Sequence, residues 1–346
     1  MPETHTVTDD KGGRFAALLF AAAWTAAGLA TLAMLLLWGY AFTPPPAVVN
    51  SPVQVYIPAG VGLVGIRKAL AESGMIADDR RFEALAAVMG VAGRLRSGEY
   101  QFQGTETPYQ LIRELEKGRL VLRTVTIPEG ADLEAVAAIL AEERLADPEA
   151  FLRYVRDPKV VQAFGGRGES LEGYLFPETY RFVRGSSLRE IVAAMVKMSD
   201  RVWEELTASA GHADRHRVLT LAAIVEKESG LAAERPLIAR VFLERLRLGM
   251  KLQADPTVAY GLKIGKRPLT RTDLATAHPY NTYQIDGLPP GPICNPGRDA
   301  IAAVLQPADE AFLYFVSNND GSHRFSKNLA DHNRAVQQYR NGRRKE

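Results

Sequence analysis

The sequence has almost no cysteine: Cys294 is the only one among its 346 residues. A single cysteine excludes an intrachain disulfide and any metal site built from several cysteines, and we expect Cys294 to be a small buried apolar residue. Net charge is also nearly absent, because 42 Lys and Arg residues oppose 40 Asp and Glu residues. This balance argues against a protein that binds nucleic acid through excess positive charge, so we expect no nucleic-acid partner.

Charged residues are missing altogether from one long stretch near the N-terminus. None lies between Arg14 and Arg67, and residues 15–42 are predominantly apolar. A bilayer core about 30 Å thick requires about 20 apolar residues at about 1.5 Å per residue. The apolar core of a cleaved signal peptide is shorter, about 7–15 residues. The run therefore predicts a single uncleaved transmembrane helix.

The positive charges that flank this run predict its orientation. Lys11 and Arg14 precede it, and no Lys or Arg follows before Arg67. The positive-inside rule then places residues 1–14 in the cytoplasm as a short tail and everything from residue 43 onward outside. Residues 43–50 begin with Thr-Pro-Pro-Pro, which predicts a stiff, extended linker because proline fixes φ.

An internal repeat follows the linker. Residues 53–60 (VQVYIPAG) match residues 123–130 (RTVTIPEG), and at the same offset Leu63, Ile66 and Leu70 match Leu133, Val136 and Leu140. Each copy predicts a strand with alternating apolar residues, a Pro/Gly turn and an amphipathic helix.

In the first copy, a helix at about 79–89 and a strand at 98–102 are expected next. This gives a small β-α-α-β module over residues 51–123. Such a module is either a reused stable unit or a polymer-binding module, and the pattern leaves both open.

The remaining part of the chain, residues 124–346, predicts a mixed α/β domain, so the fold class is α+β. Apolar periodicity predicts helices at 131–144, 147–157, 187–209, 216–229 and 234–248. Beyond residue 250, the sequence is rich in Gly, Pro, Asn and aromatic residues, which is typical of ordered loops that carry binding groups.

The most informative segment is residues 218–230, which predicts a helix that ends at Gly230. On a helical wheel Glu228 lies roughly 50° from the centre of the apolar face, and Glu226 lies roughly 110° from it. Glu228 is then the more desolvated carboxylate, and desolvation raises a carboxyl pKa toward the range of a general acid. The alternative is that Glu228 is a helix-end residue paired with Lys227 or Arg235.

Other chemistries have weaker signals. His212 and His216 have a spacing that can bind a metal ion, but no third ligand is near in sequence, so we expect no metal site. The sequence has neither a Gly-x-Ser-x-Gly nucleophile elbow nor a Gly-x-x-x-x-Gly-Lys-Ser/Thr phosphate loop.

Seven stretches together resemble one known family, the endolytic murein transglycosylases of bacterial inner membranes, also called the MltG or YceG-like family. They are residues 171–180 (LEGYLFPETY), 224–229 (IVEKES), 240–261, 280–283 (YNTY), 287–297 (GLPPGPICNPG), 315–318 and 323–333. The resemblance extends over essentially the whole chain.

The resemblance implies a specific function. Residues 51–123 would be a LysM-like module and residues 124–346 a YceG-like catalytic domain in the periplasm, anchored in the inner membrane. The enzyme would be a lyase that cuts the β-1,4 bond between MurNAc and GlcNAc inside nascent peptidoglycan strands and leaves 1,6-anhydro-MurNAc ends. Its catalytic residue would be Glu228, the second glutamate of Glu-Lys-Glu. Peptidoglycan synthases would be its protein partners.

One carboxylate suffices for this reaction, because the 6-hydroxyl of the sugar itself attacks the anomeric carbon at high effective molarity. Glu228 would act first as acid and then as base, with no metal or cofactor. The expected sugar contacts are Glu172, Tyr174, Gln253, Asp255, Tyr280, Asn281 and Asn295. For each of them, the alternative is a loop-folding hydrogen bond or a packed aromatic ring. Two other functions remain open: a non-catalytic peptidoglycan-binding scaffold and a muramidase-type hydrolase.

Overall fold

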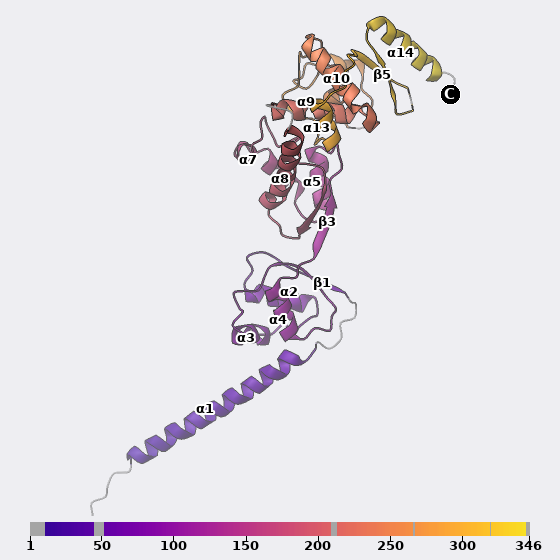
Figure 1. Cartoon of the computed structure of the whole chain (residues 1–346). Coiled ribbons are helices and arrows are strands. Elements are labelled where there is room, and N and C mark those ends of the chain that lie inside the picture. The colour runs from indigo at the N-terminus through magenta and orange to yellow at the C-terminus, as the bar shows by residue number, and fades with distance from the viewer. Residues whose placement is uncertain (1–10, 45–51, 209–212, 266, 319, 344–346) are drawn as a thin grey trace, which may run out of the picture. The chain divides into compact units, whose positions relative to one another are not determined.

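The computed structural model describes residues 11–44, 52–208, 213–265, 267–318 and 320–343 (Figure 1). The described chain divides into two compact units. The first contains the residues up to 122 together with 183–185, and the second contains the rest. Parts of the expected N-terminal tail (1–10) and of the proline-rich linker (45–50) lie outside the described residues.

The N-terminal apolar run forms one long helix, α1 (Lys11–Phe42), and its stretch from Phe15 to Phe42 is long and apolar enough to cross a membrane. The last turn of α1 packs into the first unit. Ala41 is buried there, and the ring centroids of Phe42 and Tyr109 lie 5.3 Å apart. The guanidinium of Arg81 lies 4.6 Å from the centre of the Tyr40 ring. The helix is consistent with a membrane anchor whose end is held by the first unit.

The expected β-α-α-β order of the first unit is confirmed. Its elements are β1 (Val53–Ile57), α2 (Leu63–Glu72), α3 (Arg81–Val88), β2 (Gly98–Phe102) and a further helix, α4 (Pro108–Lys117). β1 and β2 are antiparallel, with Val55 opposite Tyr100. Alternate strand residues and the inner faces of the helices form one apolar core, which includes Val55, Ile57, Leu70, Phe82, Tyr100 and Leu111. The likeness of this unit to LysM stays a prediction.

The two repeat copies fold alike at their start. The second copy forms β3 (Leu122–Thr126) and α5 (Leu133–Glu142). Gly60 and Gly130 occupy the equivalent turn with φ of +79° and +76°, a left-handed conformation that glycine adopts without steric cost. Leu70 and Leu140 are both fully buried, each in the core of its own unit. The repeat is therefore a repeated strand–turn–helix.

In its described residues, the second unit combines many helices with four short strands, which confirms the α+β class. Its further elements are α6 (Pro148–Val155), α7 (Pro158–Ala163), β4 (Thr179–Val183), α8 (Leu188–Thr207), α9 (Arg215–Glu228), η1 (Ala232–Glu234), α10 (Arg235–Arg247), α11 (Asp255–Gly261), α12 (Arg271–Ala275), α13 (Arg298–Leu305), β5 (Tyr314–Ser317), β6 (His323–Ser326) and α14 (Leu329–Arg343). β3 pairs with β4 and β5 with β6. Every sheet in the described residues has two strands, so helices rather than a large sheet form the core.

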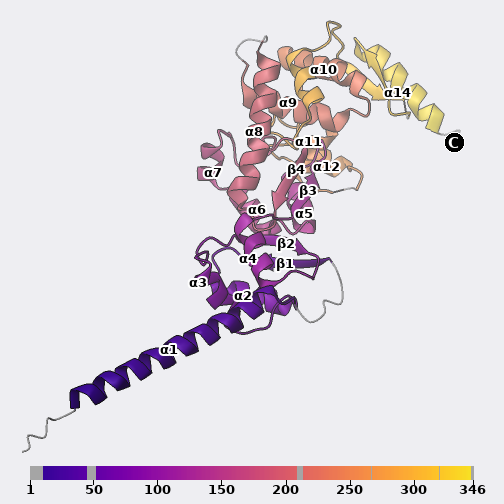
Figure 2. The ribbon, with the colours of Figure 1, turned by 60° about the horizontal axis from the view of Figure 1, so that its bottom comes forward.

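Helix α9 is the centre of this core, and α10, α11 and α13 pack around it; Figure 2 shows α10 and α11 beside it. All residues from Leu219 to Val225 are buried. The single apolar face expected from the wheel is therefore wrong: neighbours cover α9 on all sides. Ala222 and Ala223 contribute small side chains on which neighbouring elements approach closely.

The buried face of α5 provides a test of the core. Replacing Leu140, which is fully buried, by alanine removes packed methyl groups and leaves a cavity. We expect Leu140→Ala to lower the free energy of unfolding by about 2–5 kcal/mol. Urea titration of the detergent-solubilised chain, followed by the fluorescence of Trp203 in α8 after Trp24 and Trp38 have been replaced by phenylalanine, measures this. The control is Leu122→Ala, since Leu122 is 58% exposed, and a loss as large in the control would contradict the assignment.

Candidate active site

Glu228 is the last residue of α9, at the point where this buried helix reaches the surface of the second unit. Its side chain is partly buried, and it makes no hydrogen bond or ion pair with any other residue that the structure describes. Burial raises the pKa of Glu228 to about 8; the charge of Asp255 raises it further and that of Arg245 lowers it. At neutral pH, most of this carboxyl group therefore holds its proton.

Glu226, one position before Lys227, has a different environment. Arg235 donates from Nη2 to its Oε1 at 2.7 Å, and the backbone N–H of Gly297 donates to its Oε2 at 3.0 Å. The side chain is only 6% exposed, although the wheel pointed it away from the apolar face. The ion pair that was the alternative for Glu228 thus forms at Glu226, and Glu228 stays unpaired.

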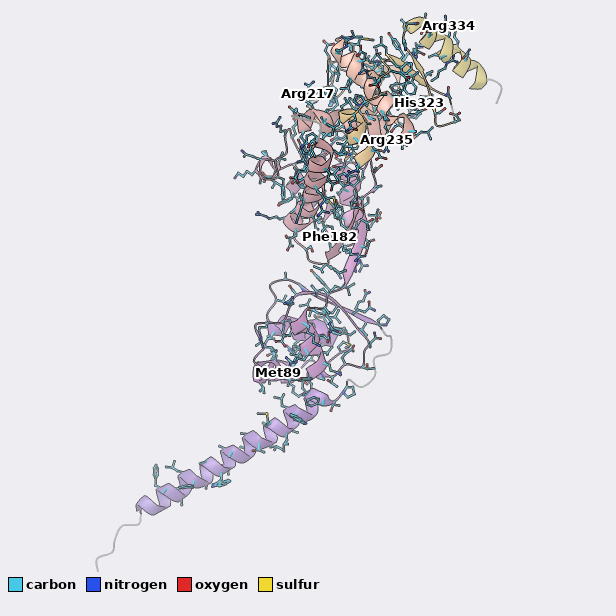
Figure 3. The ribbon with its side chains drawn as sticks, viewed as in Figure 1. Met89, Phe182, Arg217, Arg235, His323 and Arg334 are labelled. Carbon is cyan, nitrogen blue, oxygen red and sulfur yellow. The ribbon has the colours of Figure 1, made fainter. Side chains whose placement is uncertain are left out.

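Arg235, which is labelled in Figure 3, holds several segments together around the end of α9. Besides Glu226, it donates to the hydroxyl of Ser229 at 3.2 Å and to the carboxylate of Glu129 at 3.3 Å. The residue before it, Glu234, accepts from the backbone N–H and from Nδ1 of His323 in β6, at 2.9 and 2.7 Å. Because Ser229 follows Glu228 directly, these bonds fix the backbone at the carboxyl group.

A buried cation and a second carboxylate lie near Glu228. Arg245 on α10 donates from Nε to the carbonyl of Leu313 at 2.8 Å and from Nη1 to that of Leu252 at 2.6 Å. The hydroxyl of Tyr283 donates to Asp255 at 2.6 Å. Both arrangements hold a charge of fixed position beside the carboxyl group of Glu228.

Sequence reasoning did not select Arg245 or Tyr283. A signal for Arg245 was present, because it follows Ile238 and Phe242 at helical spacing and therefore falls on the apolar face of its helix. A charged residue on such a face is buried only with partners. Tyr283 had no comparable signal, since its partner Asp255 is 28 residues away.

Three of the expected sugar contacts remain accessible: Gln253 and Asp255 are exposed, and Tyr280 is half-buried. Gln253 adopts a left-handed conformation with φ of +53°, and its N–H donates to the carbonyl of Thr282 at 3.1 Å. Non-glycine residues in this region are strained, and such strain is concentrated at functional sites.

The other four, Glu172, Tyr174, Asn281 and Asn295, are buried. The side chain of Asn281 donates to the carbonyls of residues 273, 274 and 276 and accepts from the N–H of Tyr283. Asn295 accepts from the N–H of Leu175 and donates to the carbonyl of Ala131. These bonds fold the loops around the site. A sugar contact stays a prediction for all seven residues.

Glu172 is the acidic residue among these four, and only 3% of it is exposed. Burial raises its pKa to about 8, whereas the N–H of Leu133, which donates to it at 3.2 Å, opposes that shift. Tyr260 donates its hydroxyl to the same oxygen at 3.1 Å. Glu172 thus fixes the position of the Tyr260 hydroxyl through a hydrogen bond from the protein interior.

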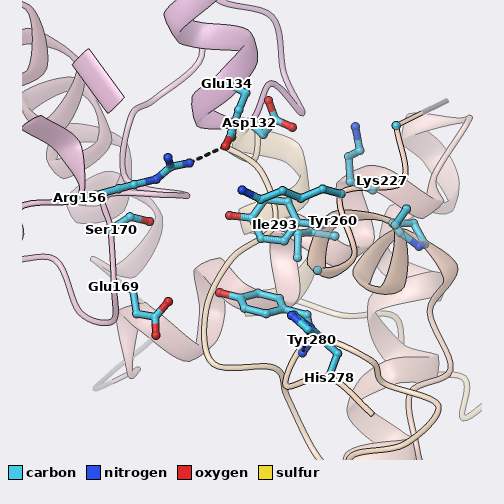
Figure 4. Close-up of a pocket in the computed structure, with 15 residues that line it drawn as sticks. Asp132, Glu134, Arg156, Glu169, Ser170, Lys227, Tyr260, His278, Tyr280 and Ile293 are labelled. Atoms are coloured by element: carbon cyan, nitrogen blue, oxygen red, sulfur yellow. Dashed lines mark hydrogen bonds and ion pairs between the residues drawn. The ribbon is translucent and has the colours of Figure 1, made fainter. Parts of the chain in front are cut away.

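Tyr260 and Tyr280 line a cavity of about 710 Å³ (Figure 4). Their ring centroids lie 5.2 Å apart, and His278 continues the aromatic wall at 6.0 Å from Tyr280. Lys227, the neighbour of Glu228, also lines the cavity.

Cys294 and His216 are both held by neighbouring residues in the second unit. Cys294 is fully buried, as expected, and burial raises the pKa of its thiol. His216 lies between Tyr174, whose hydroxyl is 3.0 Å from Nδ1, and the carbonyl of Pro290, which is 2.8 Å from Nε2. Both ring nitrogens are thus occupied. His212 lies outside the described residues.

Comparisons with known proteins agree on one family. A model described as the YceG-like family matches residues 55–338. The endolytic murein transglycosylase of Bacillus subtilis (strain 168) is 32% identical, over 84% of this chain and 85% of that protein. That of Streptococcus pneumoniae serotype 2 is 30% identical, over 84% of this chain and 59% of that protein. A crystal structure of a yceG-like protein from Listeria monocytogenes matches with a TM-score of 0.57 at 31% identity, over 82% of this chain and 98% of that one.

The raised pKa of Glu172 predicts how the free energy of unfolding depends on pH. Between pH 4.5, its ordinary pKa, and about 8, the folded chain keeps a proton that the unfolded chain releases, so ionisation favours unfolding as pH rises. We expect Glu172→Gln, which cannot ionise, to gain stability relative to the unmodified chain as pH rises from about 5 to about 8. Urea titrations of both proteins across this range measure the difference. A difference that does not change with pH would contradict it.

Proposed function

Because this chain belongs to the YceG-like family, we propose that it is a membrane-anchored endolytic murein transglycosylase. It cleaves MurNAc-β-1,4-GlcNAc bonds within nascent peptidoglycan strands and leaves 1,6-anhydro-MurNAc ends. The observation that carries this proposal is the unpaired carboxyl group of Glu228, with its pKa raised to about 8, at the end of a buried helix.

Glu228 acts first as the general acid. A carboxyl group with a pKa of about 8 holds a proton at neutral pH and can transfer it to the oxygen of the departing GlcNAc. The bond between C1 of MurNAc and that oxygen breaks, and positive charge develops at C1. Since Glu228 has no internal partner among the described residues, its proton is free to meet the substrate.

Glu228 then acts as the general base. Its carboxylate takes the proton of the MurNAc 6-hydroxyl while O6 bonds to C1, so the proton returns to Glu228 and no water is consumed. The 6-hydroxyl lies within the same sugar as C1, which gives it a high effective molarity. The charge of Arg245 favours the carboxylate form and so stabilises the intermediate stage.

A muramidase-type hydrolase is the second candidate, and Asp255 is the observation that favours it. Its carboxylate is close enough to raise the pKa of Glu228, and it accepts a hydrogen bond from Tyr283. Glycoside hydrolases use two carboxylates, one as acid and one as nucleophile or as base for water. The two reactions differ in whether the new MurNAc end is anhydro or reducing.

We expect the N-terminal apolar helix to hold this chemistry at the membrane. The charges at Lys11 and Arg14, with none following before Arg67, support a cytoplasmic N-terminus and a periplasmic catalytic unit in the inner membrane. There the LysM-like module would bind glycan strands, and peptidoglycan synthases would be neighbours. A scaffold without turnover is the remaining alternative.

Product analysis tests the reaction. We expect the full-length chain in detergent to release muropeptides with 1,6-anhydro-MurNAc ends from peptidoglycan, because O6 replaces water as the nucleophile. Mass spectrometry distinguishes these ends from reducing ends by the mass of one water. Reducing ends alone would establish the hydrolase, and the absence of soluble products would favour the scaffold.

Substitution of the two glutamates tests the catalytic assignment. Glu228→Gln cannot donate a proton, and we expect it to lower the cleavage rate by about 10²–10⁴-fold, the usual contribution of general acid–base catalysis. Glu226→Gln is the matched control, and we expect it to keep most of the activity, because the glutamine amide oxygen can still accept a hydrogen bond from Arg235 or Gly297. Far-UV circular dichroism checks that both variants fold. The opposite ranking of rates would transfer the role to Glu226.

A further inference from the structure

The cavity next to the candidate active site has features that the proposed reaction does not use. It lies wholly within the second unit, and Tyr260, Tyr280 and His278 form one of its walls (Figure 4). The hydroxyl of Tyr260 is held by the buried Glu172. The hydrogen bond to Glu172 therefore holds this wall in a fixed position.

Two elements connect the cavity to Glu228. Lys227, which precedes Glu228 on α9, lines the cavity. Helix α11 begins at Asp255, whose charge acts on Glu228, and carries Tyr260 into the cavity wall. At about 1.5 Å per residue these two positions are about 7.5 Å apart along the helix. A substituent of a sugar bound at Glu228 can thus reach the cavity.

Charges of both signs surround the opening. The cations are Arg156, Lys227 and Lys263, and the anions are Asp132, Glu134 and Glu169. Some have internal partners: Arg156 pairs with Glu134, Lys227 donates to the carbonyl of Gly130, and Asp132 caps α5. The side chains of Glu169 and Lys263 form no ion pair or hydrogen bond with other described residues, and both residues are exposed.

A free anion and a free cation beside an aromatic wall do not match a plain glycan, whose hydroxyl groups are uncharged. They match a short peptide that carries both carboxylate and ammonium groups, and in peptidoglycan such a stem peptide is attached to the lactyl group of MurNAc. We propose that this cavity binds the stem peptide of the strand being cut, with Glu169 facing an ammonium group and Lys263 facing a carboxylate. This inference rests on the proposed function.

The experiment compares two substrates of the full-length chain in detergent. One is uncrosslinked glycan with intact stem peptides, and the other is the same glycan after an amidase has removed the peptides. We expect kcat/KM to be about tenfold higher on the peptide-bearing strands, which corresponds to about 1.4 kcal/mol of additional transition-state stabilisation. The readout is the ratio of the two kcat/KM values.

Substitutions then test whether the preference for peptide-bearing strands comes from this cavity. Glu169→Gln and Lys263→Met each remove one charge while keeping the size of the side chain, and we expect each to move the ratio toward one. Glu149→Gln and Lys197→Met are the matched controls; both residues lie outside the cavity lining, and both controls keep the ratio of the unmodified chain.

The possible results distinguish a failure of the peptide site from a failure of the proposed cleavage reaction. Equal kcat/KM on both substrates, or an unchanged ratio in both cavity variants, would overturn the peptide site while leaving the cleavage reaction intact. Cleavage of neither substrate would overturn the proposed function, and the peptide site with it. Binding of free stem peptide, measured by calorimetry with the unmodified chain and with Lys263→Met, gives a second readout independent of turnover.

Discussion

The burial of helix α9 is the constraint on which the rest of the second unit depends. Its residues from Leu219 to Val225 are removed from water on all sides, and each large apolar side chain contributes about 1.5–3 kcal/mol on burial. The helix ends at Glu228, so the same packing draws this carboxyl group out of water. The stability of the core offsets the cost of desolvating an ionisable group that has no internal partner, which is the state a general acid requires.

Two glutamates separated by one residue thus have different environments. At 100° per residue they point about 160° apart, on nearly opposite sides of the helix, so different neighbours contact them. Arg235 and the N–H of Gly297 compensate the buried charge of Glu226, and Glu226 in turn anchors Arg235 next to Ser229. One carboxylate holds the helix end in place, and the other is left free at the surface of the site.

The polar residues buried beneath the site have a supporting role. Asn295 joins the turn at Gly130 and Ala131 to the segment at Leu175, and Glu172 connects that assembly to Tyr260 in the cavity wall. Fully satisfied buried networks of this kind restrict a core to one arrangement. The network therefore holds Tyr260 of the aromatic wall in a fixed position relative to the turn at Gly130 and Ala131.

Local patterns in the sequence were sufficient for the long N-terminal apolar helix, the strand–turn–helix repeat and most other helices, because hydrophobic periodicity and turn residues act over a few positions. Leu70 and Leu140, paired by the repeat alone, are both fully buried. The pairing of the charged groups was beyond such patterns. Arg235 reaches Glu129 across 106 residues and Arg245 reaches Leu313 across 68. Long-range contacts of this kind decide which glutamate of α9 is ion-paired and which keeps its proton. The reason is that burial and electrostatics depend on neighbours in space and not in sequence.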